Sequence, residues 1–140
     1  MRDFCITTDS NSDLPKEYID KFETVIIPQY YSFGDTVYGD ELHMPPKDFY
    51  ERMKGGELPQ SQANNPAVIE EKFRSVLDKG MDIIHIAFSS GLSGSYNNVC
   101  MVARELTEEY PGAQITVIDS LNVSLGESLM VIYANKLKES

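Results

Sequence analysis

Apolar and polar positions alternate in blocks along this chain, and their spacing predicts strands interleaved with helices. Four short apolar runs are typical of buried strands: residues 3–8, 25–31, 83–88 and 115–119. Helix-start signals or helical spacing mark five further segments: after Asp13-Leu14-Pro15, 46–54, after Asn65-Pro66, 96–110 and 129–138. Because strands that alternate with helices indicate βαβ crossovers, the pattern predicts an α/β fold, with a mostly parallel sheet covered by helices on both faces.

Two local features add detail to this outline. Residues 32–40 alternate around Gly34-Asp35 and predict a β-hairpin arm beside the sheet. Ser12 or Asp13 is expected to cap the first helix, with Pro15 near its first position. No internal repeat or low-complexity linker interrupts the chain, so residues 1–140 are expected to form one domain.

The loop that follows the apolar run 83–88 is rich in hydroxyls and glycines. It reads Ser89-Ser90-Gly91-Leu92-Ser93-Gly94-Ser95, and a helix-period pattern follows at once. The free N–H groups of a first helical turn and the helix dipole favour an anion at such a junction. One of these serines is expected to cap the helix, and the loop as a whole is a candidate ligand site.

Polar segments follow three of the predicted strands, at residues 8–12, 89–95 and 119–120. Parallel strands bring such loops to the carboxyl edge of the sheet, where open α/β folds bind ligands. Two carboxylates repel an anionic ligand, so Asp9 and Asp119 are expected to bond loop N–H groups and helix caps. The alternative, a Mg²⁺ phosphotransfer site, has no phosphate-binding lysine beside it, and no metal or cofactor is expected.

Two catalytic patterns are incomplete in this sequence. The segment from Gly91 to Ser95 begins like the nucleophile elbow G-x-S-x-G, but the last glycine is displaced by one position. A nucleophilic Ser93 also needs a base, and only His43 and His85 are available. His85 lies inside an apolar run, where a core histidine is the commoner explanation. A P-loop and a G-x-G-x-x-G motif are both absent.

Composition and charge limit the classes of partner and the cellular location that this chain can have. The net charge of −10, with 12 basic residues, argues against nucleic acid, which needs clustered Lys and Arg. No segment approaches the roughly 18 apolar residues of a membrane span, and the amino terminus lacks the apolar core of a secretory signal. A cytoplasmic location is therefore expected. Cys5 and Cys100 lack C-x-x-C spacing and are expected to be reduced, buried thiols.

Four segments of the chain together resemble successive blocks of the DegV family. They are Ile6 to Pro15, Val25 to Tyr31, Phe88 to Tyr96 and Val117 to Ser120, in the family's order and over nearly the whole chain. The resemblance implies a bacterial fatty-acid-binding protein that serves as the lipid-presenting subunit of fatty acid kinase. The expected role is that of a carrier, not a catalyst, which holds the acyl carboxyl group while the partner kinase phosphorylates it.

The resemblance also implies which residues hold the carboxyl group. Ser93 matches the serine of the family's L-S-G block, and Ser61 matches the threonine of its P-x-T-S block. This chain keeps a hydroxyl at Ser61 but has Gln62 where the family has a serine, which alters the setting of the donor. Neighbouring loop residues are expected to border the same site: Ser89, Ser90, Gly94, Asp9 and Ser10.

Chain length adds a further expectation. The family has two domains in a chain about twice this long, so this chain looks like the amino-terminal domain alone. The resemblance implies that the second domain supplies cationic and histidine groups to the headgroup. Weak lipid binding and self-association are therefore expected of the 140 residues. Candidates for the wall of the lipid tunnel, or else for plain core, are Ile27, Phe33, Phe88 and Met101.

Two functions from other classes stay open at this stage. One is a serine hydrolase that uses Ser93 with His85 or His43 as its base. The other is a phosphotransfer module, because the family's fold resembles those of sugar-phosphotransferase and dihydroxyacetone-kinase domains. Phosphorylation of His85 by a phosphodonor would support that second reading.

Overall fold

The computed structural model describes residues 2–140, and it contains two sheets. The larger sheet is parallel, with four strands in the order β2 (Val25–Ile27), β1 (Phe4–Asp9), β6 (Asp82–Ala87) and β7 (Ile115–Asp119). The smaller sheet is antiparallel, with the order β4 (Thr36–Tyr38), β3 (Tyr30–Phe33) and β5 (Gln60–Gln62). The predicted α/β class, the parallel sheet and the hairpin arm are confirmed.

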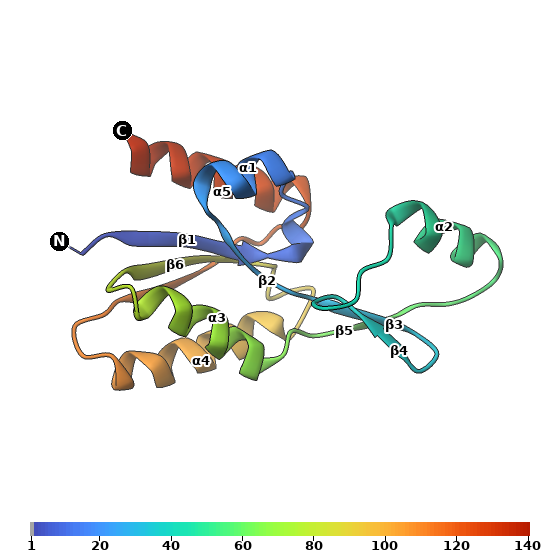
Figure 1. Ribbon diagram of the computed structural model, residues 1–140, viewed down its shortest axis with the longest axis horizontal. Helices are drawn as coiled ribbons and strands as arrows, with labels where there is room; N and C mark the ends of the chain where they lie inside the picture. The colour runs from blue at the N-terminus through green and yellow to red at the C-terminus, as the bar shows by residue number, and fades with distance from the viewer. Residues whose placement is uncertain (1) are drawn as a thin grey trace.

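Helices cover both faces of the parallel sheet, as Figure 1 shows. α1 (Lys16–Phe22) and α5 (Leu125–Glu139) lie on one face, and α3 (Pro66–Leu77) and α4 (Ser95–Glu109) lie on the other. The core between the sheet and the pair α3 and α4 is built around Ile69, Phe73, Val99 and Leu106. A smaller core under α1 and α5 includes Val131 and Leu14.

The antiparallel sheet and α2 (Pro46–Lys54) form a separate part of the fold, residues 30–62, which we call the arm. The arm lies beside the layered body in Figure 1 and is inserted between β2 and α3. Phe49 of α2 packs edge to face on Tyr31 and Phe33, with ring centroids 5.1 and 5.5 Å apart. Aromatic contacts therefore hold α2 against the antiparallel sheet.

The predicted strand at 25–31 is wrong as a single element. The chain leaves the parallel sheet after Ile27 and enters the antiparallel sheet at Tyr30. Pro28 has no N–H to donate to a ladder, and the N–H of Gln29 donates to Ser10 Oγ at 2.9 Å instead of to a strand. The apolar run thus supplies strands to two sheets.

Three smaller expectations are also corrected. Neither Ser12 nor Asp13 caps α1, because Pro15 occupies the N-cap position without a side-chain hydrogen bond. The last helix begins at Leu125, earlier than residue 129, since Ser124 is tied to the loop after β1 by bonds to Asn11 O and Asp13 Oδ2. Cys5 and Cys100 are free thiols, as predicted, but they are half-buried.

The connections of the parallel sheet diverge between β1 and β6. The chain leaves β1 through α1 toward β2, on one side, and leaves β6 through α4 toward β7, on the other. The two loops therefore run to opposite faces and leave a crevice at the carboxyl ends of these strands, the usual place for a ligand in an open α/β sheet.

Candidate functional site

Two cavities lie where the arm meets this crevice. A polar cavity of about 280 Å³ is lined by Asn11, Gln29, Tyr30, Ser61, Gln62, Ala63, Phe88, Leu92 and Ser93. An aromatic cavity of about 420 Å³ is lined by Asn11, Gln29, Tyr30, Tyr31, Met44, Pro46, Phe49, Tyr50, Pro59 and Ser61. The two share Asn11, Gln29, Tyr30 and Ser61, so they adjoin.

Ser61 and Ser93 both line the polar cavity, although 31 residues lie between them in the sequence. Ser61 lies on β5, paired with Tyr31 of β3. Ser93 belongs to the loop between β6 and α4. The structure thus brings one hydroxyl from the arm and one from the body to a single cavity, which is the geometry that two donors to one anion require.

β5 is an element that the sequence pattern does not predict. Its three residues, Gln60, Ser61 and Gln62, are all exposed and none is apolar. Pairing with β3 makes this segment a strand. The strand fixes the position of Ser61, which a loop would leave free to vary.

Ser93 sits at the start of α4 without occupying its cap position. Gly94 holds the N-cap position and makes no side-chain hydrogen bond, so the predicted serine cap is wrong in that respect. Ser93 Oγ nevertheless accepts the N–H of Ser95, the first helical residue, at 3.1 Å. Its own hydroxyl donates to Ser95 Oγ at 3.0 Å.

Asp9 joins the two crevice loops from the end of β1. It is almost fully buried and accepts from the Phe88 N–H at 2.5 Å and from Gln29 Nε2 at 3.1 Å. Burial alone raises the pKa of this carboxyl group, but the neighbouring His85 imidazole and these hydrogen bonds outweigh burial and hold the pKa below its usual value. Asp9 is therefore a carboxylate, and its predicted role in bonding the loops agrees with these contacts.

Glu127 of α5 is a second buried carboxyl group close to Asp9. Burial, followed by the negative charge of Asp9, raises the pKa of Glu127 to about 8. The hydroxyl of Thr8 has one proton and two acceptors within reach, Ile86 O at 2.8 Å and Glu127 Oε1 at 2.9 Å. A protonated Glu127 supplies the second proton that this arrangement needs.

His85 lies in the middle of β6 and is fully buried. Its Nδ1 is 2.8 Å from Thr7 Oγ1, and its Nε2 is 3.7 Å from Asp9 Oδ2 without a hydrogen bond. Within residues 2–140 no hydrogen bond links His85 to a serine of the loop, and neither cavity is lined by His43. The histidine is part of the core, as the apolar run around it predicts.

The remaining predicted site residues hold the loops around the cavities. Ser10 Oγ accepts from Gln29 N, and Ser89 Oγ accepts from Gly91 N at 3.2 Å. Ser90 N–H donates to Asp119 Oδ1 at 3.1 Å, and bonding to Ser90 lowers the pKa of Asp119. The three polar loops thus converge at one sheet edge, as the parallel topology predicts.

Several lining residues escape prediction from sequence. Asn11, Gln29 and Tyr30 border both cavities. A polar residue after a proline inside an apolar run, as in Pro28-Gln29, is the signal that could have indicated the break. Of the four proposed wall residues, Phe88 lines the polar cavity, Ile27 and Phe33 are buried core, and Met101 is exposed on α4.

Two kinds of feature are not found in the part of the chain that the structure describes. No helix there combines the length and apolar character that a membrane crossing requires. Residues 2–140 also contain no group of three His, Cys, Asp or Glu side chains placed to hold a metal ion.

Comparison with known proteins identifies relatives of this chain. The family model described as "Uncharacterised protein, DegV family" matches residues 3–140. A DegV domain-containing protein of Clostridium perfringens is 34% identical over 141 residues, which cover 99% of this chain and 48% of the relative. A second such protein, from Lactococcus lactis, is 30% identical and is covered to the same extent, 48%. The chain thus spans about half the length of these relatives.

Solved structures share the fold. A stearic acid-binding protein from Eubacterium ventriosum has a TM-score of 0.90 and 29% identity, over 97% of this chain and 47% of that one. A fatty-acid-binding DegV family protein from Thermus thermophilus has a TM-score of 0.86 and 27% identity. The match covers 99% of this chain and 48% of that one. With the match of the family model over residues 3–140, these likenesses show that the chain belongs to the DegV family.

Proposed function

We propose that this protein binds a long-chain fatty acid, with the carboxyl group at Ser61 and Ser93 and the tail in the aromatic cavity. The observation that carries the proposal is the adjoining pair of cavities, one with two hydroxyls and one walled by aromatic rings. Two solved relatives described as fatty-acid-binding support the ligand class, although the chain covers about half of each.

The two cavities would divide the binding free energy unequally. Burial of apolar surface contributes roughly 0.8 kcal/mol per CH₂, so a long tail contributes on the order of ten kcal/mol before the losses of association. A hydrogen bond to a charged carboxylate contributes only about 1.5–3 kcal/mol. The tail therefore sets affinity, and Ser61 and Ser93 set which end of the lipid is presented.

The same arrangement favours a carrier that hands its acyl group to another enzyme. The Ser93 hydroxyl donates a hydrogen bond to Ser95 Oγ, and within residues 2–140 no histidine accepts a hydrogen bond from Ser93. Ser93 therefore lacks the base of a hydrolase. His85 is fully buried, which keeps a phosphodonor from its ring. We infer an acyl kinase partner in the cytoplasm, to which the protein presents the carboxyl group.

Residues 1–140 are proposed to act as the amino-terminal half of such a carrier, with part of the headgroup charge supplied from elsewhere. Within the described residues no Lys or Arg lines either cavity. An uncompensated carboxylate binds less tightly than one paired with a cation. We therefore expect weaker fatty acid binding than in a two-domain relative of the DegV family.

The proposed function is tested with the chain as it stands, expressed in bacteria. Native mass spectrometry should find a co-purified fatty acid, and titration with a fluorescent fatty acid should be reversed by an unlabelled one. A fluorophosphonate probe should leave Ser93 unlabelled. Absence of any lipid in both binding experiments would contradict the proposal, whereas labelling that disappears in Ser93→Ala would favour a hydrolase.

We also propose that this chain associates with a second copy through α5. Four large apolar residues, Leu125, Leu129, Tyr133 and Leu137, are spaced by four and are each more than half exposed. We call them the α5 stripe. Ridges of residues four apart interdigitate with their own kind at a crossing angle near −50° in helix pairs, so the stripe suits a two-fold contact with itself.

A further inference from the structure

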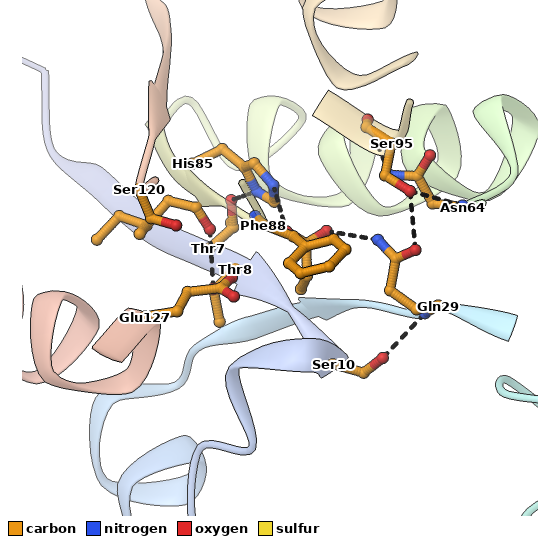
Figure 2. Close-up of polar contacts among 12 residues, drawn as sticks. Thr7, Thr8, Ser10, Gln29, Asn64, His85, Phe88, Ser95, Ser120 and Glu127 are labelled. Carbon is orange, nitrogen blue, oxygen red and sulfur yellow. Dashed lines mark hydrogen bonds and ion pairs between the residues drawn. The ribbon is translucent and has the colours of Figure 1, made fainter. Parts of the chain in front are cut away.

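Gln29 is the residue through which the buried end of β1 reaches the hydroxyl cluster. Its side-chain Nε2 donates to Asp9 Oδ1 at 3.1 Å, and its Oε1 accepts from Ser95 Oγ at 2.8 Å. Figure 2 shows this side chain extending between the strand ends and Ser95, with its backbone N–H bonded to Ser10. Both ends of the amide are therefore occupied, and the side chain is held in one orientation.

The direction of every hydrogen bond in this chain of contacts follows from the charge at one end. Asp9 is a carboxylate and only accepts, so the NH₂ of Gln29 faces Asp9 and the carbonyl oxygen faces Ser95. Ser95 gives its single hydroxyl proton to that carbonyl. Its Oγ must then act as an acceptor, and it receives the Ser93 hydroxyl and the Asn64 N–H, at 3.0 and 3.2 Å.

This directionality decides what Ser93 offers to the polar cavity. Its hydroxyl proton is directed at Ser95, and its Oγ is held by the Ser95 N–H. A rotation about the Cβ–Oγ bond turns the hydroxyl proton from Ser95 toward a ligand in the cavity without moving the oxygen. Ser95 Oγ still accepts from the Asn64 backbone N–H after this rotation. The rotation therefore breaks only the hydrogen bond from Ser93 to Ser95, and Ser95 Oγ retains a donor.

We propose that Gln29 is a positioning residue for the bound carboxylate, which acts through Ser95 to keep the Ser93 proton directed away from the polar cavity until a ligand draws it there. The inference rests on the proposed function, and it assigns to Gln29 an effect on the headgroup and not on the tail. Asp9 anchors the amide, so a charge buried in the body determines how a hydroxyl at the surface of the cavity is oriented.

Gln29→Met tests the proposal, because methionine has a similar length and donates no hydrogen bond. The probes are a fatty acid and the fatty alcohol with the same tail, whose hydroxyl donates to Ser93 Oγ and needs no proton from it. Affinity for the acid should rise, by up to about tenfold, because Ser95 then donates to Ser93 Oγ and the Ser93 proton reaches the carboxylate without giving up a hydrogen bond. Affinity for the alcohol should not rise, since Ser93 Oγ then accepts from both the N–H and the hydroxyl of Ser95. In a Ser93→Ala background, Gln29→Met should leave the affinity for the acid unchanged.

Controls separate this role from a structural one. Gln60→Met changes a glutamine of the arm that lines neither cavity, and it should leave both affinities unchanged. Ser95→Ala removes the acceptor of the Ser93 proton, and it should repeat the acid-selective gain if Gln29→Met folds poorly. A loss of affinity for the acid, equal changes for acid and alcohol, or the same gain in the Ser93→Ala background would overturn the inference alone. A wild-type chain that binds neither probe would overturn the proposed function and this inference together.

Discussion

Ser93 is engaged on both sides of its hydroxyl before any ligand arrives, since it donates to Ser95 Oγ and accepts from Ser95 N–H. Ser61 is exposed on a short strand, and its hydroxyl makes no hydrogen bond within residues 2–140. The two donors therefore differ in how well they are organised. The better organised donor should contribute more to binding, because less of its freedom is lost when a ligand binds.

The first prediction follows for the two serines. In a full-length version of this protein, Ser93→Ala should weaken acyl presentation to the proposed kinase partner more than it weakens retention of the lipid, and Ser61→Ala should act in the same direction but less. The double variant should lose less than the two single variants together, because the proposal has both hydroxyls serve one carboxylate. Acyl-phosphate formation and lipid titration are the two measurements. Strict additivity would mean that the serines do not share a ligand.

Glu127 leads to a prediction about pH. Its pKa is raised to about 8 in the folded state, so between its unfolded value and pH 8 the folded protein holds a proton that the unfolded chain has released. Stability from this group is complete below its unfolded pKa and is lost as pH rises toward 8. The slope approaches about 1.4 kcal/mol per pH unit for one proton.

Glu127→Gln keeps the neutral side chain and removes the titration. Urea unfolding from pH 5 to pH 9 should therefore show the wild-type losing stability, relative to the variant, as pH rises. The difference between the two proteins isolates Glu127, because every other titrating group is common to both. The lowered pKa of Asp9 has the opposite effect on stability, which falls as the pH drops below the usual pKa of an aspartate and therefore lies outside this range. A constant difference across the whole range would contradict a raised pKa.

At the scale of elements, Gly39 fixes how the β3–β4 hairpin passes the start of β3. Its φ is +150°, and a Cβ at this position would lie 2.6 Å from Gln29 O and 2.7 Å from Tyr30 Cδ1. Two residues that line both cavities would have to move to admit it. The turn and the site are therefore coupled by a close backbone approach.

Gly39→Ala should consequently destabilise the protein and weaken lipid binding at the same time. Gly34→Ala in the same hairpin is the matched control, because its φ is +55° with no atom within 4 Å of the added Cβ. That control should cost only the left-handed strain, about 1–2 kcal/mol. Thermal unfolding and lipid titration of both variants measure the difference, and equal effects on binding would show that the contact with Gln29 has no bearing on the site.

Elements differ in how far their sequence determines them. Strands β1, β6 and β7 are predicted from apolar runs, because they are hydrogen-bonded within a sheet that helices cover on both faces. β5 has no apolar residue and exists because β3 offers it a partner, which no local pattern records. In the same way, topology predicts that loops 8–12 and 89–95 converge, whereas the place of Gln29 depends on where the arm leaves the sheet.

At the scale of the whole molecule, the α5 stripe is a row of four exposed apolar side chains along one helix. Leu129 and Tyr133 are 67% and 65% exposed at the middle of the helix, and no charged side chain interrupts the helix between Ser128 and Asn135. An exposed apolar row of this length marks an interaction surface. The proposed association would remove it from water.

Light scattering after size-exclusion chromatography should find a dimer for the wild-type chain. Leu129→Lys should give a monomer, because a charge would be placed at the centre of the contact. Leu58→Lys is the control, since Leu58 is 84% exposed but lies outside the stripe, and this variant should remain a dimer. A monomeric wild-type chain at high concentration, or an unchanged dimer in Leu129→Lys, would contradict the proposal.

The arm joins the body through two short segments, residues 28–29 and 63–65, which are close to each other because β3 and β5 are paired. The polar cavity lies between Tyr30 and Ser61 of the arm and Phe88 and Ser93 of the body, whereas the aromatic cavity is lined by the arm except at Asn11 and Gln29. A hinge at these two segments would therefore open the polar cavity without disturbing the core of the body. Release of the headgroup would then follow the frequency with which the arm lifts. Residence time and affinity would become separately adjustable properties of the same molecule.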